Sequence, residues 1–551
     1  MAEAQQPAPM RWWGWGDPAR PSGLPDQALA FLGATVGVAA QPRPPVALGS
    51  VRLSASRLKP ATLQRLRDVL GAGAVREDHG ARVLHAAGKG YPDLVRLRAG
   101  EPEGSPDAVL YPADHGQLRA VLAACAEASI AVVPFGGGTS VVGGVAPLAG
   151  EHGAVVALDT CRMGGVIALD RDSATVRVQG GMRAPALERH LSPRGLTLGH
   201  FPQSYEYVSL GGCAATRSAG QASSGYGAIE KMVLGLRLAA PNADIELPAL
   251  PATAAGPGLR QLLVGSEGTL GVISELALRV RPAPAERRYE GVFFAELAAG
   301  AEALRALARE HVLPDVARLS DEQETRMSMA LAGGGPKAAL GRAYLALRGY
   351  RGGCLAILGF EGAAEDVAYR RSRALALARA HGGLPVGASP GRAWLAARYA
   401  APYLRDDLLT HGVMVETLET ATQWSNLLAL HGRVVRAISA ALAAAGTPGL
   451  VMCHVSHVYE TGASLYFTFL ARQQPDDPIG QWQTVKRAAC EEIVAGGGTI
   501  THHHAVGLDH APWMRREIGE GGLRALSAVK AELDPAGIMN PGKLGLLSRS
   551  G

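Results

Sequence analysis

The sequence predicts an α+β protein with two large domains, and three observations support this. A chain of 551 residues is long enough for two to four domains with buried cores. Short strand-like segments alternate with helical patterns from about residue 105 to residue 285. Residues 290–475 then show long helical patterns with strand candidates between and after them.

The first of these regions alternates strands with helices. Leu118, Val121, Leu122 and Cys125 follow the i, i+3, i+4, i+7 spacing of one helix face. The apolar side chain of Cys125 is expected in the core. A second helix is predicted at 184–194. Strands are predicted at 108–111, 130–133, 155–158, 175–178, 235–240 and 272–280.

Pro282 and Pro284 mark a boundary, after which the pattern changes. Beyond it, helices are predicted at 297–310, 364–380 and 420–445, and strands at 355–359 and 464–470. The last 75 or so residues predict helices at 478–494 and 520–532, on either side of a histidine cluster.

Composition excludes some classes of function. The net charge is +5, and no long run of Lys or Arg is present, so nucleic acid is not an expected partner. The mild positive charge suits an anionic small molecule or a membrane surface, and simple solubility explains it equally well. The six cysteines form no C-x-x-C pair, which argues against zinc-ribbon, iron–sulfur and thioredoxin-like motifs. A reducing cytoplasm is the expected compartment, with peripheral membrane contact left open.

The first 55 or so residues are Pro-rich and irregular, apart from a cluster of tryptophans at Trp12, Trp13 and Trp15. Three indoles so close together are not expected to face solvent. They predict that the N-terminal arm docks onto a folded domain. An aromatic wall of a ligand site is the alternative.

The most informative segment is Pro134-Phe135-Gly136-Gly137-Gly138-Thr139-Ser140, which follows a predicted strand. Three glycines let the main chain turn tightly and bring several N–H groups against an anion. The spacing matches neither a Walker sequence nor G-x-G-x-x-G. Because glycine is abundant here, 70 of 551 residues, a plain turn is the alternative.

Two further segments have the same small, hydroxyl-rich character. Such segments suit a main chain laid along a flat ligand, where bulky side chains would block its approach. The first candidates are His200, Gln203, Ser204, Ser209, Thr216, Arg217, Ser218 and Ala219. The next are Gly265, Ser266, Glu267, Gly268, Thr269, Leu270 and Gly271. Three segments in order within about 140 residues are strong evidence for one bound cofactor.

The order of these three segments resembles the flavin-binding domain of the vanillyl-alcohol oxidase superfamily, also called the PCMH type. The resemblance covers roughly residues 105–285 and implies a two-subdomain fold. It further implies FAD in an extended pose, with its diphosphate on the first glycine segment. Some relatives attach the flavin through a histidine in this loop. Residues 136–140 contain none, so the FAD is expected to be non-covalent.

Motifs along the rest of the chain are similar to those of the alkyldihydroxyacetonephosphate synthase family. These motifs are Trp13-Gly14-Trp15-Gly16, Arg318-Leu319-Ser320-Asp321, Tyr403-Leu404-Arg405-Asp406, Tyr466-Phe467-Thr468-Phe469 and Thr501-His502-His503-His504. The resemblance implies an arm and helical segment (1–104), an FAD-binding domain (105–285), and an α+β cap with an antiparallel sheet and flanking helices (286–475). A C-terminal helical segment (476–551) is then expected to return to the flavin site.

The family resemblance also implies roles for individual residues. Tyr466 becomes a proton donor or acceptor, although a core tyrosine is the alternative. Arg318 is assigned to the flavin-facing pocket, and Arg405 to the substrate phosphate, where a surface pair with Asp406 is the alternative. His200 could equally be structural. The resemblance further implies that three adjacent histidines line the flavin pocket and contribute to activity: His502, His503 and His504.

Three adjacent histidines also raise the question of a metal. On a strand, His502 and His504 would share a face and could bind one metal, while His503 would point away. No further ligand motif lies nearby in sequence, so no metal is predicted. Acid–base chemistry is favoured because imidazole titrates near neutrality, and a surface tract is the alternative.

The family resemblance implies that an ester-linked acyl chain on dihydroxyacetone phosphate is exchanged for an ether-linked fatty alcohol, without net oxidation. The main alternative is an FAD-dependent dehydrogenase or oxidase of a 2-hydroxy acid or another alcohol. A flavin-binding protein without catalysis is the third. Expected partners are therefore a phosphorylated three-carbon lipid and a fatty alcohol, or another small substrate. A homodimer is left open.

Overall fold

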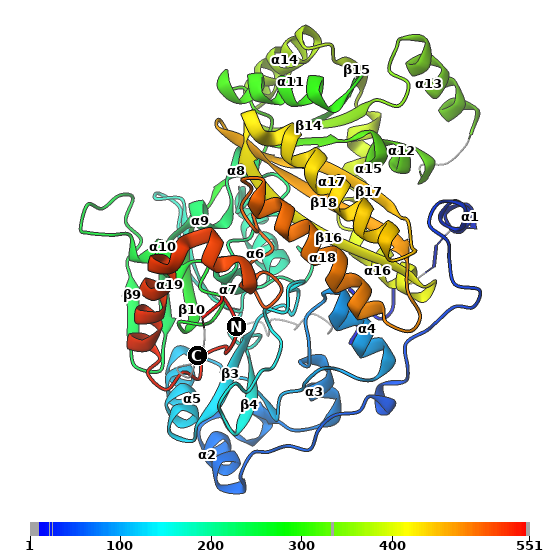
Figure 1. The fold of residues 1–551 in the computed structure, drawn as a ribbon. Coiled ribbons are helices and arrows are strands. Elements are labelled where there is room, and N and C mark those ends of the chain that lie inside the picture. The colour runs from blue at the N-terminus through cyan, green and yellow to red at the C-terminus, as the bar shows by residue number, and fades with distance from the viewer. Residues whose placement is uncertain (1–9, 21–22, 25, 332–334, 547–551) are drawn as a thin grey trace.

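The computed structural model describes residues 10–546, except 21–22, 25 and 332–334. The chain folds into an N-terminal lobe (residues 48–282) and a cap (residues 286–495), and residues 496–546 run back to the N-terminal lobe (Figure 1). Helices and strands are mixed throughout, so the predicted α+β class is confirmed.

The first subdomain of the N-terminal lobe is a four-stranded sheet of order β1-β2-β4-β3, with β2 and β3 both parallel to β4. Its strands are β1 Val75–Arg76, β2 Ala108–Leu110, β3 Ile130–Phe135 and β4 Ala154–Asp159. Its helices are α2 Pro60–Leu70, α3 His79–Leu84 and α5 His115–Glu127, while α4 Tyr91–Ala99 contacts the cap, whose core includes Tyr91 and Leu94. The predicted face of α5 is buried, with Cys125 inside the core. Because β1 and α2 join this unit, it begins before residue 105.

The second subdomain is a five-stranded antiparallel sheet of order β5-β6-β10-β8-β9. Its strands are β5 Val166–Asp170, β6 Thr175–Gln179, β8 Val233–Ala239, β9 Asp244–Leu247 and β10 Val272–Arg279. A small ladder joins β7 Leu196–Thr197 to β11 Arg281–Pro282. The helices are α6 Ala184–Leu191, α7 Leu210–Ala215, α8 Ser223–Tyr226, α9 Ile229–Met232 and α10 Leu259–Leu263.

The cap contains a seven-stranded antiparallel sheet of order β15-β12-β14-β13-β17-β18-β16. Its strands are β12 Glu286–Phe294, β13 Val316–Ser320, β14 Cys354–Gly362, β15 Leu384–Gly387, β16 Val413–Gln423, β17 Leu450–Val458 and β18 Gly462–Arg472. The helices are α11 Leu297–Arg309, α12 Glu322–Leu331, α13 Pro336–Leu347, α14 Ala364–Ala380, α15 Ser389–Ala397, α16 Ala401–Thr410, α17 Leu427–Ala444 and α18 Pro478–Ala495.

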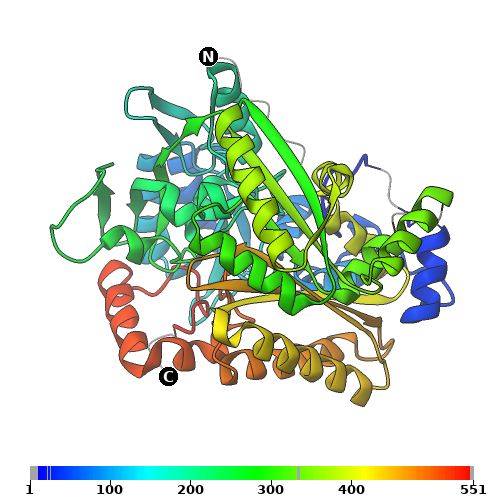
Figure 2. The same cartoon turned by 90° about the horizontal axis from the view of Figure 1, so that it is seen from above.

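The two faces of the cap sheet border different parts of the molecule. Successive side chains of a strand point to opposite faces. Phe467 and Phe469 therefore enter a large apolar core that also contains side chains of α11, α14, α17 and α18. Figure 2 shows α17 (yellow) and α18 (orange) lying side by side along the sheet. Tyr466 and Thr468 point to the other face, which borders a cavity. One face holds the cap together, and the other is available for chemistry.

The C-terminal segment crosses back to the first sheet. Helix α19 Met514–Leu533 is kinked at Gly519 (φ 72°) and begins earlier than the predicted 520–532. Beyond it, the Val132 N–H of β3 donates to the Ile538 carbonyl oxygen (2.8 Å), and the Asn540 N–H donates to the Val132 carbonyl oxygen (2.9 Å). The end of the chain thus covers the open edge of β3.

Some predicted elements differ from the structure. The helix predicted at 420–445 begins at Leu427, because residues 420–423 belong to strand β16. Glu416 and Glu419 are fully buried in that strand and break its apolar pattern. Helix α1, Asp26–Thr35, was not predicted in the Pro-rich arm. It packs against α12.

One helical stretch, Trp424–Ala444, is long and apolar enough to cross a membrane by length and composition, with a mean hydropathy of 1.4. In the fold, Leu430, Val434 and Ile438 of this stretch pack into the core of the cap. Arg433 instead reaches Glu492 of α18 at the surface. We interpret the stretch as an amphipathic helix covering one face of the sheet.

Candidate active site

A cavity of about 570 Å³ lies where the glycine segments of the N-terminal lobe meet the polar face of the cap sheet. This volume is within the usual range for cofactor and ligand sites. The predicted residues that line it are Pro134, Phe135, Gly136, Gly137, Gly138, Thr139, Ser140, Gln203, Ser204, Ser209, Thr216, Ser218, Ala219, Glu267, Gly268, Gly271, Arg318, Arg405, Tyr466, His503 and His504.

The remaining predicted residues are not among those lining the cavity: His200, Arg217, Gly265, Ser266, Thr269, Leu270 and His502. Their contacts indicate supporting roles. His200 is buried and contacts Ser218 Oγ through Nε2 (3.2 Å). Arg217 donates from Nε to the Val264 carbonyl oxygen (3.0 Å), and so braces the third glycine segment from behind. The local pattern of small residues located these segments, but it did not separate lining side chains from bracing ones.

The first glycine segment is arranged to receive an anion. Among the residues that the structure describes, none accepts a hydrogen bond from the backbone N–H groups of residues 136–140. A Cβ on Gly136 would collide with Ser209 Oγ, and one on Gly137 with the Tyr207 carbonyl oxygen. Glycine is therefore needed because the first two segments nearly touch. Unpaired N–H groups in a tight loop fit the diphosphate of a dinucleotide.

Glu267 ties the third glycine segment to the C-terminal segment. Its carboxylate accepts hydrogen bonds from the N–H groups of Val506 (2.8 Å) and Gly507 (2.7 Å). Burial raises the pKa of Glu267 to about 7. The Asn540 side-chain amide donates to the Glu267 carbonyl oxygen (2.7 Å). Glu267 thus fixes the chain just after the histidine cluster against the cavity.

The three histidines lie in a loop, so the strand alternation considered for them is wrong. The loop is held by Glu419, whose carboxylate is completely buried. That carboxylate accepts hydrogen bonds from the backbone N–H of His503 (3.1 Å) and His504 (2.7 Å), from the N–H of His502, and from Thr501 Oγ1 (2.7 Å). Glu419 of β16 also lies directly opposite Tyr466 of β18 in the register of the two strands. One carboxylate therefore sets the position of the loop relative to Tyr466.

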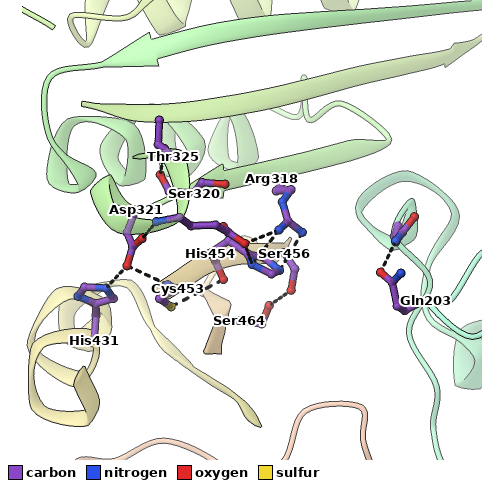
Figure 3. A network of polar contacts seen from close by, with 12 residues as sticks. Gln203, Arg318, Ser320, Asp321, Thr325, His431, Cys453, His454, Ser456 and Ser464 are labelled. Atoms are coloured by element: carbon purple, nitrogen blue, oxygen red, sulfur yellow. Dashed lines mark hydrogen bonds and ion pairs between the residues drawn. The ribbon is translucent and has the colours of Figure 1, made fainter. Parts of the chain in front are cut away.

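Tyr466 lies between aromatic neighbours on the polar face of the cap sheet. Its ring stacks on His454 with a centroid distance of 4.8 Å, and it lies perpendicular to the His504 ring with a centroid distance of 5.3 Å. Arg318 of β13 contacts His454 Nε2 through Nη1 (2.9 Å) (Figure 3). It also donates to Glu324 Oε1 through Nη2 (2.7 Å). Arg318, His454 and Tyr466 thus form one continuous polar surface.

His454 and His457 were missed in the sequence, although both line the cavity. Residues three apart on a regular strand point to opposite faces. The pairing of β17 with β18 shifts between Val455 and Val458, and this irregularity changes the alternation. The register shift depends on the partner strand, so the local sequence gave no signal for it.

Among the described residues, His457, His502 and His503 form a group whose ligand atoms lie within 4.8 Å of one another. This differs from the pairing of His502 with His504 considered from the sequence. The Nδ1 atom of each ring has a protein partner: His457 Nδ1 contacts Ser223 Oγ, and His502 Nδ1 lies 2.9 Å from His503 Nδ1. The absence of a metal stays a prediction.

Burial sets the protonation of the catalytic candidates. It lowers the pKa of His503 and of His504 to about 4, despite the nearby Glu419 carboxylate. It also raises the pKa of Tyr466. At neutral pH the imidazoles are therefore neutral and able to accept a proton, while the Tyr466 phenol keeps its own.

Comparison with known proteins identifies the class first. Residues 106–246 match a family model described as an FAD binding domain, and residues 283–544 match the C-terminal domain of FAD linked oxidases. These matches and the unpaired N–H groups of the glycine loop define a flavoprotein whose cofactor is FAD.

Full-length relatives then identify the family. The alkyldihydroxyacetonephosphate synthase of Trypanosoma brucei brucei is 35% identical over 90% of this chain and 82% of its own length. That of Dictyostelium discoideum is 31% identical over 91% and 83%. A solved alkyldihydroxyacetonephosphate synthase structure matches with a TM-score of 0.85, 28% identity and coverage of 97% and 99%. The chain belongs to the alkyldihydroxyacetonephosphate synthase family.

We predict that Gly137→Ala weakens FAD binding at least about tenfold, because the new Cβ forces the loop away from the Tyr207 backbone. Gly153→Ala is the control, since a Cβ there meets no atom within 4 Å. Titration of the apoproteins with FAD, followed by flavin fluorescence, measures both. Equal FAD affinities of Gly137→Ala and the parent would contradict the assignment of this loop to the FAD diphosphate.

We predict that Glu419→Gln destabilises the protein by roughly 3 kcal/mol, because the amide presents donors to backbone donors inside the core. Glu492→Gln is the control at an exposed pair with Arg433, expected within about 0.5 kcal/mol of the parent. Denaturant unfolding of the FAD-loaded proteins checks this. An unchanged midpoint in Glu419→Gln would show that the histidine loop does not depend on this carboxylate.

Proposed function

We propose that this protein exchanges the acyl chain of an acyl-dihydroxyacetone phosphate for a fatty alcohol, forming the ether bond of an ether lipid. The observation that carries the proposal is the composition of one cavity. It combines the FAD-binding loops, the cationic side chains of Arg318 and Arg405, a proton-transfer group and an apolar branch. Membership of the alkyldihydroxyacetonephosphate synthase family supports the same reaction.

The apolar branch suits a long alkyl chain. Its wall consists of side chains that both line the cavity and belong to one buried apolar cluster: Met327, Leu408, Val415, Met452 and Leu470. Leu32 of α1 packs on the same cluster from outside. A wall of this kind offers a hydrocarbon chain a gain of about 0.8 kcal/mol for each CH₂ group it buries.

The polar end of the cavity suits a phosphorylated ketone. Arg405 has the fork-shaped guanidinium that matches a phosphate, and among the described residues it has no carboxylate partner. Arg318 contacts His454, which stacks on Tyr466, and from this position it can polarise a carbonyl group. The substrate is thus held by its phosphate at one end and its chain at the other.

The exchange breaks the bond between the substrate carbon and the ester oxygen, which leaves with the carboxylate. It forms a bond from the same carbon to the alcohol oxygen, so no electron acceptor is consumed. Bound FAD supplies an electron-accepting ring that makes expulsion of a carboxylate from a saturated carbon feasible. The neutral rings of His503 and His504 can take a proton from the substrate carbon or from the alcohol. The Tyr466 phenol can donate its proton to the substrate and take one back from these rings.

We also propose peripheral contact with an anionic membrane through α13. Leu340, Tyr344 and Leu347 are exposed on this helix, at 73%, 46% and 86%. Arg342 and Arg348 on and beside the helix add positive charge. An exposed apolar face with basic neighbours is typical of helices that lie in a bilayer surface. The preceding helix α12 contributes Leu331 to both the surface and the cavity, which gives a lipid a short path.

We predict that the FAD-loaded protein converts palmitoyl-dihydroxyacetone phosphate and hexadecanol into an alkyl product without consuming an electron acceptor. Tyr466→Phe should lower turnover at least about a hundredfold, because proton transfer is lost. Tyr369→Phe, at an exposed position, is the control. Product mass spectrometry with an oxygen electrode measures both. Anaerobic bleaching of the flavin by a 2-hydroxy acid would instead indicate a dehydrogenase.

We predict that the protein sediments with vesicles of phosphatidylglycerol and phosphatidylcholine at low salt. The double variant Leu340→Glu/Leu347→Glu should abolish this, because charge replaces the apolar face. Leu259→Glu, an exposed leucine on the N-terminal lobe, should sediment like the parent. Equal sedimentation of all three proteins would contradict the assignment to α13.

A further inference from the structure

The N-terminal tryptophan motif packs against the helix that carries Arg405. From here on, the N-terminal arm means residues 11–20 only, the part of the Pro-rich region that carries the tryptophans. Its first part is closed by a backbone hydrogen bond from Arg11 N–H to the Gly16 carbonyl oxygen (2.9 Å). A Cβ on Gly14 would collide with the Asp406 carboxylate, and one on Gly16 (φ +79°) with the Tyr403 ring. The two glycines of the motif therefore allow close approach to α16.

Asp406 anchors this arm. It follows Arg405 in sequence and is 1% exposed. One carboxylate oxygen, Oδ2, accepts a hydrogen bond from the Trp15 N–H (2.8 Å) and another from Arg11 Nη1 (3.4 Å). Burial raises the pKa of Asp406 to about 6, which the nearby cations oppose. The surface Arg–Asp pair considered from the sequence is therefore replaced by a buried anchor for the arm.

The arm also reaches a lysine that the sequence analysis did not single out. Lys89 lines the cavity and donates from Nζ to the Arg11 carbonyl oxygen (2.8 Å). Arg405 Nη1 donates to the Lys89 carbonyl oxygen (2.7 Å), and the Lys89 N–H donates to the Ser140 carbonyl oxygen (2.6 Å). A continuous set of contacts thus joins the arm, Lys89, Arg405 and the glycine loop.

Both cations are available for an anionic ligand. Their hydrogen bonds go to backbone carbonyl oxygens, and neither forms an ion pair with a carboxylate among the described residues. The two carboxylates that line the cavity are already engaged, Glu267 by backbone N–H groups and Glu324 by Arg318. Burial lowers the pKa of Lys89 to about 8, so its ammonium stays mainly charged at neutral pH. Two such cations in one cavity favour a doubly charged ligand.

We propose that Lys89 and Arg405 together bind the phosphate of the substrate, and that the N-terminal arm positions both through Asp406 and the Arg11 carbonyl oxygen. The inference rests on the proposed function insofar as it takes the substrate to be a phosphate monoester. Lys89 contributes a point charge and Arg405 a planar fork, so the pair recognises the group by charge and by shape. The arm, far from them in sequence, fixes their spacing.

Isothermal titration calorimetry of the FAD-loaded full chain with dihydroxyacetone phosphate and with inorganic phosphate tests the proposal. Lys89→Gln and Asp406→Asn should each weaken binding at least about tenfold, and raise KM for the acyl substrate with kcat nearly unchanged. Asp407→Asn, the adjacent carboxylate, should change binding less than about twofold. Retained flavin absorbance shows that each variant is folded.

Two further variants keep the test decisive if Asp406→Asn or Lys89→Gln does not fold. Gly14→Ala displaces the arm and keeps both cations, so it should also raise KM, and an unchanged KM would overturn the positioning role. Lys89→Arg keeps the charge and should recover part of the affinity lost in Lys89→Gln. Folded variants that bind both phosphates like the parent would refute the subsite. If the variants bind phosphate more weakly but the parent protein shows no ether-forming turnover, only the proposed function would be refuted.

Discussion

The two-residue alternation of the cap strands is the constraint on which the site depends. β13, β17 and β18 must each supply apolar side chains to the core beneath the helices, which fixes their register. Once Phe467 and Phe469 are buried, Tyr466 has only the opposite face to occupy. The same argument places Arg318 and His454. A register slip of one residue would exchange the two sets, so the free energy of core packing also holds the side chains that line the cavity in place.

Buried charge is the second organising feature. Glu419, Glu267 and Asp406 are all buried carboxylates, and each accepts hydrogen bonds from a segment distant in sequence. A buried charge without such partners would be strongly destabilising. Each carboxylate therefore stabilises the fold only when its partner segment is docked. The histidine loop, the C-terminal segment and the N-terminal arm are thereby coupled to the lobes that they complete.

Local patterns and resemblance predicted much of this arrangement. Glycine segments are visible because small residues cluster wherever a backbone must approach another group, and the predicted strands and helices of the N-terminal lobe lie close to the observed ones. Glu419 and Lys89 were missed, since their importance comes from contacts with residues far along the chain. β16 was partly read as helix, because a strand with two buried glutamates lacks the apolar alternation that marks a strand.

The backbone bonds between Val132 and residues 538–540 have a consequence for biosynthesis. A ribosome releases those residues some 400 positions after β3 has emerged. Throughout that interval the edge of β3 offers unpaired N–H and C=O groups to other chains. A nascent N-terminal lobe is therefore exposed to intermolecular strand pairing, and chaperone holding or early FAD capture would have the most effect on yield during this window.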